Sequence, residues 1–376
     1  MDPMVADAAT EIANHAEREL EALVAISSPS RDVPGAEEAI ALCVALLPVG
    51  AQTERVPCST AASAPDLIAR LAGEGSRRLL LLGHLDTVVG HDAHAPLRHE
   101  SGRLYGPGTA DMKGGVVLAL GVARALAERP ELFAELSLLL VTDEEWRTAD
   151  FGHVETFAGY DACLCFEAGE RTAGGGEGVV VRRKAAGTLR VMARGRAAHS
   201  GSAPDQGRNA LLALAAVAPT AASLHDPQGA ERLSVVPTVI RSGEALNVVP
   251  AAGELIFDIR ADRLEAFEPV VEAIPQEVAG VALETTVERL WPGMDSEAAT
   301  APLLERASAR LGRRIVGVSR GGASDASHFA PAIGLTVDGL GPRGGGAHTP
   351  QEFVLTESLL ERAEVAMALA REALDP

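Results

Sequence analysis

Two kinds of hydrophobic pattern alternate along the first half of the chain. The run "RLLLLGHLD" (78–86) is a continuous apolar stretch bounded by charge, which is typical of a strand buried on both faces. The segment "GGVVLALGVARALAE" (114–128) has apolar residues at helical spacing and is soon followed by a proline. Further buried strands are predicted in "ELSLLLVTDEE" (135–145) and "YDACLCFEAGE" (160–170). This strand–helix–strand order predicts an α/β fold, with a mixed, mostly parallel sheet covered by helices on both faces.

The pattern changes near residue 178 and changes back near residue 291. Between them, "VVVRRKAAGTLRVMARGRAAHSG" alternates like antiparallel strands, and "NALLALAAVAPTAASL" predicts a helix. Two strand-like segments, a helix from about Arg263 and a strand near Leu283 follow. This βαββαβ order predicts a small ferredoxin-like α+β domain over residues 178–290. It would be inserted into a larger domain made of residues 1–177 and 291–376.

The composition limits which binding partners and which cellular compartment are expected. The formal net charge is 33 − 52 = −19, which argues against nucleic acid or an anionic membrane surface as a partner. The four cysteines form no CxxC motif and are expected to be buried, reduced thiols, as in a cytoplasmic protein. The acidic N-terminal segment lacks an apolar signal core, and the longest apolar stretch is shorter than the ~20 residues that span a bilayer. A cytoplasmic protein is therefore expected.

Each of the three buried strands is followed by residues that can bind a metal. His84 and Asp86 follow the first strand, Glu144 and Glu145 the second, and Glu167 the third. In open α/β sheets the chemistry gathers at the carboxyl ends of the strands. His84 and Asp86 are two residues apart on one strand face, so Asp86 can fix the ring orientation of a metal-bound His84.

A shared carboxylate and a second histidine complete a set of metal ligands. "GPGTADMKGG" places Asp111 in a glycine-supported turn before a helix, where it could bridge two cations. The turn is not a phosphate-binding loop, because Lys113 is followed by glycine and Pro107 interrupts any G-x-G-x-x-G pattern. Glu145, Glu167 and His348 add ligands, and one histidine plus one terminal carboxylate per ion suits two Zn²⁺, with Co²⁺ or Mn²⁺ also acceptable.

Ser324 and Asp325, in "GGASDASHFA", are predicted to begin a helix. The N-terminus of that helix could help to hold an anionic group of a substrate.

Eight motifs together resemble one enzyme family. These are "GHLDT", "GPGTADMKGG", "TDEEW", "FEAGE", "GRAAHSGSAPDQGRNA", "NVVPAAGELIFDIR", "GGASDASHFA" and "GGGAHTPQEFV". They occur in the order seen in the co-catalytic zinc carboxypeptidase and deacetylase family, and the resemblance covers about residues 10 to 373. That family includes glutamate carboxypeptidase, acetylornithine deacetylase, succinyl-diaminopimelate desuccinylase and aminoacylase. The resemblance implies a catalytic domain interrupted by a lid, or dimerisation, domain, and a homodimer formed through the lid.

The resemblance also implies a role for each residue of the metal site. One zinc ion would be held by His84, Asp111 and Glu167, and the other by Asp111, Glu145 and His348. Asp86 would orient His84, and Glu144 would be the general base. The peptide bond after Asp111 is cis in relatives.

Other residues would bind the substrate by the same resemblance. His199 would reach the active site of the neighbouring subunit and help to hold the oxyanion. Asn247 and Arg260 would recognise the carbonyl and the carboxylate of the substrate, and Gly345 and Gly346 would line the pocket. Glutamate-specific relatives have a further arginine, for which Arg289 is the nearest candidate. Trp146, directly after the two glutamates, departs from the family pattern.

The sequence therefore predicts a zinc-dependent hydrolase of an amide bond next to a free carboxylate, most similar to glutamate carboxypeptidase. Its substrate would be a small acyl-amino acid or a short peptide. The alternative within enzymes is an N-acyl-amino-acid deacylase, such as acetylornithine deacetylase or succinyl-diaminopimelate desuccinylase. A more remote alternative is a non-catalytic metal-binding homologue, against which the intact ligand set and Glu144 argue.

Overall fold

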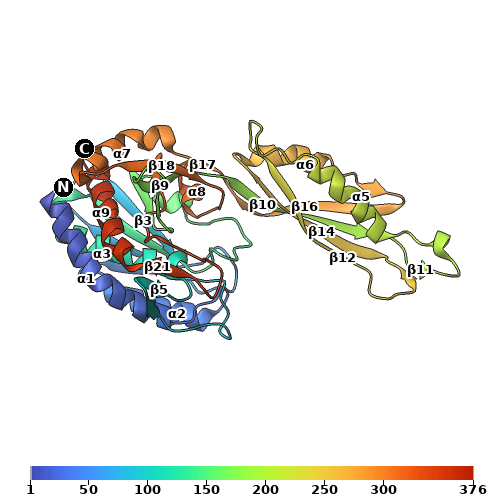
Figure 1. Cartoon of the computed structure of the whole chain (residues 1–376), viewed down its shortest axis with the longest axis horizontal. Coiled ribbons are helices and arrows are strands. Elements are labelled where there is room, and N and C mark those ends of the chain that lie inside the picture. Colours follow the sequence, from blue (N-terminus) through green and yellow to red (C-terminus); the bar gives the residue numbers. More distant parts are fainter. Residues whose placement is uncertain (1, 376) are drawn as a thin grey trace. The chain divides into compact units, whose positions relative to one another are not determined.

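The computed structural model describes residues 2–375, which divide into two compact units. The first unit comprises the residues up to Arg182, Met294–Arg320 and the residues from Ser324 onward. The second unit comprises Arg183–Gly293 together with Gly321–Ala323. Figure 1 draws both units and labels some of their elements.

A six-stranded sheet is the centre of the first unit. Its strand order is β1-β2-β6-β3-β7-β19. These strands are β1 (Gln52–Val56), β2 (Asp66–Ala72), β6 (Glu135–Val141), β3 (Arg78–His84), β7 (Ala162–Cys165) and β19 (Leu335–Val337). The strands from β6 to β19 pair in parallel, and β2 and β1 continue the sheet as antiparallel strands. The predicted mixed, mostly parallel sheet is confirmed.

Successive leucines of β3 point to opposite sides of the sheet, so both of its faces are apolar. Helices cover both faces. Leu79 and Leu81 pack in one hydrophobic cluster with residues of the long helices. Leu80 and Leu82 pack in another cluster, with residues of the two short helices. The long helices are α1 (Pro3–Ala25), α2 (Val33–Leu46), α3 (Gly114–Ala127), α7 (Glu297–Leu311) and α9 (Thr356–Ala373), and the short ones are α4 (Val154–Phe157) and α8 (Ala326–Phe329).

Two small sheets complete the first unit. One has the order β17-β9-β18, with β8 also paired to β9, and the other has the order β20-β21-β5-β4. The strands of the first are β8 (Glu170–Arg171), β9 (Glu177–Arg183), β17 (Met294–Asp295) and β18 (Ile315–Arg320). Those of the second are β4 (Arg98–Glu100), β5 (Arg103–Tyr105), β20 (Gly344–Gly345) and β21 (Phe353–Leu355). Two short helical turns, η1 (Thr109–Lys113) and η2 (Pro130–Leu132), flank α3.

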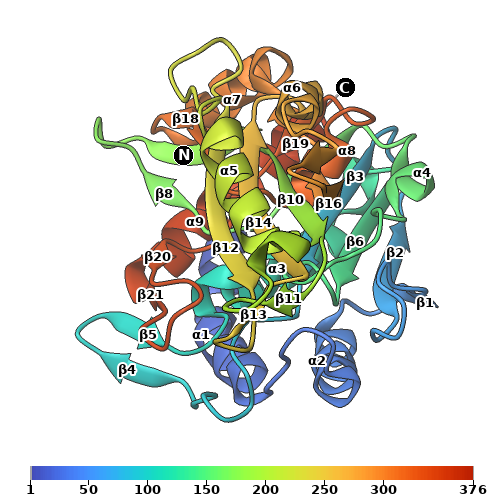
Figure 2. The ribbon, with the colours of Figure 1, turned by 90° about the vertical axis from the view of Figure 1, so that its right-hand side faces the viewer.

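The second unit is an antiparallel sheet with helices packed on it. The strand order is β12-β14-β10-β16-β15, and the helix α5 packs on β12, β14 and β10 (Figure 2). The strands are β10 (Ala185–Arg194), β12 (Ser234–Ser242), β14 (Ala252–Ala261), β15 (Glu277–Val278) and β16 (Val281–Trp291). The helices are α5 (Ala210–Ala222) and α6 (Glu268–Glu272), with the turns η3 (Pro204–Gln206) and η4 (Leu264–Phe267). The order β10–α5–β12–β14–α6–β16 is the predicted βαββαβ order, and it leaves β12 at one edge of the sheet.

A two-stranded ladder also belongs to the second unit. It joins β11 (Ala198–His199) to β13 (Val248–Val249). Asn209 accepts a hydrogen bond from the backbone N–H of Leu212 and so caps the N-terminus of α5.

All four cysteines are free thiols. Cys43, Cys163 and Cys165 are buried, and Cys58 is half-buried. No helix within residues 2–375 is both long enough and apolar enough to cross a membrane.

Candidate metal site at the carboxyl ends of the parallel strands

The parallel pairing brings the ends of three strands to one edge of the sheet. His84 pairs with Val141 at the end of β6, and Leu82 pairs with Cys165 at the end of β7. His84, Glu145 and Glu167 therefore leave neighbouring strand ends on the same side of the sheet. The structure brings them together although more than 80 residues separate His84 from Glu167 in the sequence.

Asp111 lies between the two histidines of the site. Its Oδ1 is 3.1 Å from Nε2 of His84, and its Oδ2 is 3.1 Å from Nε2 of His348. The turn that carries it contains a cis peptide bond between Asp111 and Met112. One carboxylate thus presents one oxygen to each imidazole, which is the arrangement that a bridging ligand requires.

Two three-residue groups share this carboxylate. Ligand atoms of His84, Asp111 and Glu167 lie within 4.8 Å of one another, as do those of Asp111, Glu145 and His348. Glu167 Oε1 is 3.7 Å from Nε2 of His84, and Glu145 Oε1 is 3.2 Å from Nε2 of His348. Each group combines one imidazole with two carboxylates, a donor set that fits a divalent cation such as Zn²⁺.

Asp86 organises the backbone around this site. Its side chain lies 3.3 Å from Nδ1 of His84, which also contacts the Asp86 carbonyl oxygen at 3.0 Å. The same carboxylate accepts hydrogen bonds from the backbone N–H groups of Glu144 and Glu145, each at 3.1 Å, and from Ser30 Oγ at 2.6 Å. Asp86 therefore fixes both the ring of His84 and the loop after β6, and the contacts with the loop and with Ser30 were not foreseen from the sequence.

The site concentrates negative charge. Burial raises the pKa of Glu144 well above its ordinary value, and neighbouring carboxylates, among them Glu145 and Glu167, add to the rise. Burial also raises the pKa of Glu145. Hydrogen bonds to Asp111 and Glu145 raise the pKa of His348 to about 10. Buried carboxylates that repel one another in this way are stabilised by a nearby cation.

Beside Glu144, Arg147 neutralises two further carboxylates. Its side chain is only 1% exposed. Its Nε and Nη2 donate to Asp143 Oδ1 at 3.2 and 3.0 Å, and its guanidinium also pairs with both oxygens of Asp325. Asp143 pairs with Arg147 inside the loop after β6, and Arg147 joins that loop to Asp325 at the start of α8.

We expect Arg147→Met to lower the free energy of unfolding by about 3–5 kcal/mol, because it leaves Asp143 and Asp325 buried without their counter-charge. Urea denaturation followed by far-UV circular dichroism measures the change. The matched control is Arg129→Met, whose side chain is half exposed and pairs with Glu131 at the surface, and it should stay within about 0.5 kcal/mol of the parent. Equal stability of the two variants would contradict the role of the buried pair.

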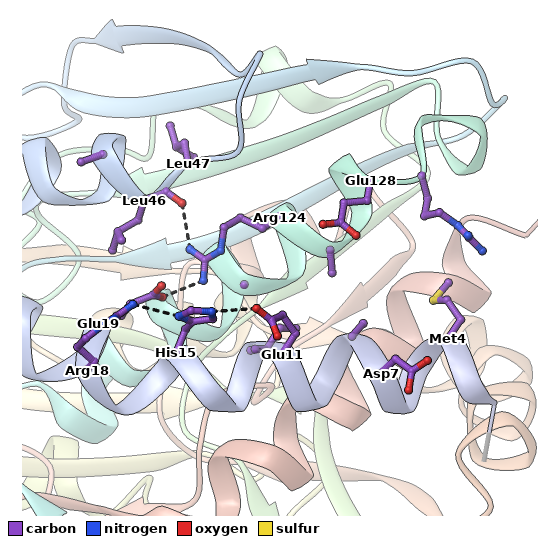
Figure 3. Close-up of a pocket in the computed structure, with 16 residues that line it drawn as sticks. Met4, Asp7, Glu11, His15, Arg18, Glu19, Leu46, Leu47, Arg124 and Glu128 are labelled. Carbon is purple, nitrogen blue, oxygen red and sulfur yellow. Dashed lines mark hydrogen bonds and ion pairs between the residues drawn. The ribbon is translucent and has the colours of Figure 1, made fainter.

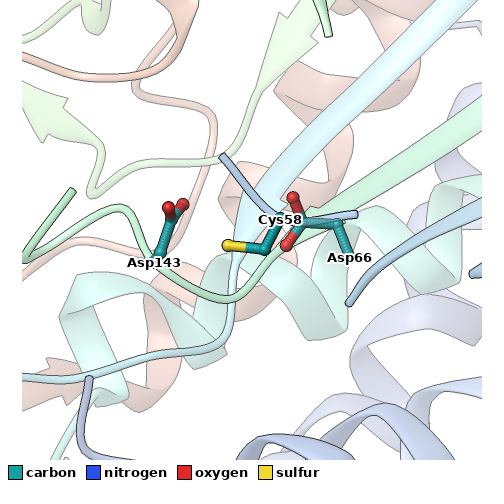
Figure 4. Close-up of side chains that lie close together, drawn as sticks. All are labelled: Cys58, Asp66 and Asp143. Carbon is teal, nitrogen blue, oxygen red and sulfur yellow. The ribbon is translucent and has the colours of Figure 1, made fainter. Parts of the chain in front are cut away.

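A separate group with metal-ligand chemistry lies in the same unit, but hydrogen bonds already occupy its ligand atoms. Figure 4 shows Cys58 between Asp66 and Asp143, with ligand atoms within 4.8 Å of one another. Asp66 accepts from the Thr142 N–H at 2.9 Å and contacts His153 Nε2 at 2.7 Å, while Asp143 accepts from Thr60 and Arg147. Burial and the two carboxylates raise the pKa of the Cys58 thiol to about 12. This cluster is therefore part of the hydrogen-bonded core.

Two expected substrate residues of the second unit lie side by side. His199 pairs with Val248 in the β11–β13 ladder, and the carbonyl oxygen of Asn247 accepts the Ser200 N–H at 3.0 Å. Nδ1 of His199 accepts the N–H groups of Gly201 and Ser202, each at 3.1 Å. The proton of a neutral His199 therefore resides on Nε2, which can donate to an anionic oxygen.

Arg260 lies near the other end of β14. Its guanidinium donates to Asp258 at 2.9 and 3.3 Å and to the Gly321 carbonyl at 2.9 Å. Arg289, the candidate for a further arginine, lies with its guanidinium 5.6 Å from the ring centroid of Trp291.

The remaining expected residues differ in exposure. Ser324 and Asp325 are buried, with Ser324 Oγ donating to Asp338 at 2.8 Å and Asp325 paired with Arg147. Gly345 is half-buried at the end of β20, and Gly346 lies in the exposed loop before His348. Trp146 is 48% exposed, and the Arg31 guanidinium lies 5.8 Å from its ring centroid.

A separate groove lies among the long helices of the first unit. It has a volume of about 930 Å³ and is lined by α1, α3 and the end of α2 (Figure 3). Within it, Arg124 donates to Glu19 at 2.9 Å and to the Leu46 carbonyl at 3.0 Å. Among the described residues, none of the metal-site cluster lines this groove, so it is distinct from the site at the strand ends.

The chain is similar to known proteins over most of its length. The model of peptidase family M20/M25/M40 matches residues 80–372. Carboxypeptidase G2 of Pseudomonas sp. (strain RS-16) is 28% identical over 321 residues, which are 81% of this chain and 76% of that protein. Succinyl-diaminopimelate desuccinylase of Rhodospirillum centenum (strain ATCC 51521 / SW) is 30% identical over 327 residues, with 79% of this chain and 81% of that protein covered. The crystal structure of an M20 family metallo-carboxypeptidase from Sulfolobus solfataricus matches with a TM-score of 0.76, 16% identity and coverage of 96% and 99%, and it supports the fold alone.

Proposed function

This chain belongs to peptidase family M20/M25/M40, and we propose that it is a zinc-dependent hydrolase of an amide bond next to a free carboxylate. Within that class we propose an activity like that of glutamate carboxypeptidase, on a small acyl-amino acid or short peptide. The observation that carries the proposal is the Asp111 carboxylate between two imidazoles, with Glu144 next to one of the ligands. That constellation holds both the metal ligands and a candidate base for hydrolysis.

We propose that two zinc ions bind here. His84, Asp111 and Glu167 would hold one ion, and Asp111, Glu145 and His348 would hold the other. The mixture of imidazole and carboxylate also accepts Co²⁺ or Mn²⁺. When bound, such a metal pair polarises the scissile carbonyl and lowers the pKa of water.

Different side chains around the proposed metal ions would transfer the proton and stabilise the developing charge. Glu144 would take a proton from the attacking water and return it to the departing amine, a role that suits a carboxylate whose pKa is raised by burial. Asp86 would keep His84 and the backbone of Glu144 in place. Nε2–H of His199 would donate to the developing oxyanion, since Nδ1 already accepts two backbone N–H groups.

We propose that the second unit is a lid and dimerisation domain. From Ala252 to Arg260, β14 rises by roughly 27 Å at 3.4 Å per residue, and His199 lies beyond the near end of that strand. One copy of the unit is therefore badly placed to offer both His199 and Arg260 to the same substrate, whereas two copies could each offer one. The edge strand β12 and the helix α5 expose apolar side chains at Val236, Ile240, Leu211 and Leu212, which a partner subunit would cover. Sedimentation velocity tests this proposal, and a monomer at micromolar concentration would contradict it.

The cytoplasm is the compartment that we propose. Its support is that all four cysteines are free thiols, since a reducing compartment keeps thiols in that state.

A substrate panel on the zinc-loaded protein tests the proposed activity. Release of glutamate from acyl-glutamates is compared with release of acetate from acetyl-ornithine and of succinate from succinyl-diaminopimelate. We expect acyl-glutamates to be cleaved fastest, chelation to abolish the activity, and zinc to restore it. Faster cleavage of the other two substrates would favour the deacylase alternative, which the desuccinylase relative supports. No hydrolysis of any of them after zinc is restored would contradict the proposal.

Arg260 should determine the requirement for a free carboxylate. Loss of its charge-assisted hydrogen bonds, worth about 1.5–3 kcal/mol, should raise KM for acyl-glutamates by about 10- to 100-fold in Arg260→Ala, with a smaller change for the matched α-carboxamide. Steady-state kinetics on the two substrates measure the difference. Arg241→Ala is the control, because its exposed side chain pairs with Glu254 elsewhere on the sheet. An equal change in KM for the acid and for the amide would show that Arg260 does not recognise the carboxylate.

A further inference from the structure

Three backbone N–H groups of the turn that carries Asp111 converge on one buried side chain. Glu352 Oε2 accepts from Gly108 at 2.8 Å, and its Oε1 accepts from Ala110 at 2.7 Å and from Asp111 at 2.9 Å. Glu352 is 2% exposed, so water does not compete for these donors. Converging N–H groups of this kind form a concave site for an anion, and hydrogen bonds to a carboxylate are stronger than those between neutral groups.

The conformation of the turn requires this support. Gly108 has φ of 74°, in the left-handed region that favours glycine, and a Cβ there would lie 2.9 Å from the Thr87 side chain. Asp111 and Met112 have non-helical dihedral angles inside η1. The N–H groups of this irregular backbone cannot be satisfied within a regular helix, so an external acceptor has to supply the hydrogen bonds.

The segment that contains Glu352 is tied to the turn by further bonds. The carbonyl oxygen of Glu352 accepts the Gly106 N–H at 3.0 Å, and the following residue, Phe353, pairs with Tyr105 in the β5–β21 ladder. His348 precedes Glu352 by only four residues and places Nε2 3.1 Å from Asp111 Oδ2. One short segment thus supplies a candidate metal ligand and also holds the backbone of the shared ligand.

On the opposite side, Lys113 anchors the end of the turn. Its buried Nζ donates to the carbonyl oxygens of Ile26 at 2.7 Å and Leu23 at 3.2 Å, at the end of α1. Within residues 2–375, however, Glu352 is the residue whose side chain accepts the N–H of Asp111 itself. The position of the Asp111 carboxylate between the two imidazoles therefore depends most directly on Glu352.

We propose that Glu352 is a positioning residue of the metal site, which fixes the Asp111 carboxylate so that it can bridge two cations. This inference rests on the proposed metal site. Glu352 contacts neither ligand oxygen of Asp111 and acts only through the backbone of the turn. Outer partners that orient metal ligands typically contribute about 10- to 100-fold to metal affinity.

The test is the metal affinity of Glu352→Gln, measured with zinc by competition against a chromophoric chelator. The amide keeps the shape of the side chain but turns an NH₂ group toward at least one N–H donor, so the turn loses an acceptor. We expect affinity about 10- to 100-fold weaker than in the parent. Glu357→Gln is the matched control, because Glu357 is 72% exposed in the first turn of α9, and its affinity should equal that of the parent. Glu352→Asp keeps the charge on a shorter side chain and should give an intermediate affinity.

The outcomes separate this inference from the proposed function. A folded Glu352→Gln variant that binds zinc as tightly as the parent would overturn the positioning role alone. A parent protein that binds no zinc would overturn the metal site and the positioning role together. If Glu352→Gln does not fold, Glu352→Asp decides, because parental affinity in that folded variant would also overturn the role.

Discussion

Glu144→Gln should lower kcat by about 10²- to 10⁴-fold while the protein retains its metal. Glutamine keeps the size of the side chain and removes its basicity, so the attacking water loses its proton acceptor. The backbone N–H of Glu144 would still donate to Asp86, because that bond does not involve the side chain. The proposed metal ligands His84, Glu145 and Glu167 are unchanged, which is why we expect metal content to stay at the parental value.

Steady-state kinetics together with metal analysis of the purified variant measure both parts of this result. Asp150→Asn is the matched control, since Asp150 is an exposed carboxylate in the same loop and should leave kcat unchanged. Retained turnover in Glu144→Gln would show that another group accepts the proton. Loss of metal along with turnover would instead make Glu144 a ligand, and either result would overturn its role as general base.

The second large effect is expected at Asp111. Because its two oxygens face two different imidazoles, Asp111→Ala removes one ligand from each of the two groups at once. We expect the loss in metal affinity to exceed the ~10- to 100-fold typical of outer partners, and amide hydrolysis to fall to the uncatalysed background. No other single ligand of the site belongs to both groups.

This prediction is tested by removing the metal with a chelator, restoring zinc, and comparing the activity of the parent with that of Asp111→Ala. Parent protein stripped of metal should lose activity and regain it when zinc is restored, whereas Asp111→Ala should stay inactive under the same conditions. His15→Ala serves as the control, because His15 lies in the groove among the long helices, contacts Glu11 and takes no part in the metal site. Activity of Asp111→Ala at stoichiometric zinc would contradict the shared ligand.

The sheet and the position of the site could be predicted because they depend on local pattern and on general topology. Uninterrupted apolar runs such as "LLLL" in β3 occur where both faces are covered, and parallel neighbours bring their carboxyl ends to one edge. For that reason the acidic residues after β6 could be predicted to belong to the site. Membership of the family was predicted from the motifs and the fold class from the order of strand and helix patterns, and the family match and the solved structures confirm both.

Contacts between distant segments could not be predicted in the same way. Glu352 and Ala110 are 242 residues apart, and Arg147 and Asp325 are 178 apart. The residue types gave little signal, since a lone glutamate four residues after a histidine is common on surfaces. Only tertiary structure shows that these side chains are buried and which groups they satisfy. Trp146 belongs to the same class, because its contact with Arg31 comes from a separate segment, and the structure gives no reason for its departure from the family pattern.

The small sheet β17-β9-β18 has a consequence for how the chain could be rearranged. The second unit leaves after β9 and returns at β17, and these two strands are neighbours, with the Ser296 N–H donating to the Val181 carbonyl at 2.9 Å. Adjacent strands lie only about 5 Å apart, so a turn of a few residues could join them with a small cost in closure entropy. The second unit is thus inserted between two strands that lie next to each other in the first unit. A shortened protein in which a turn joins β9 directly to β17 is compatible with this connection.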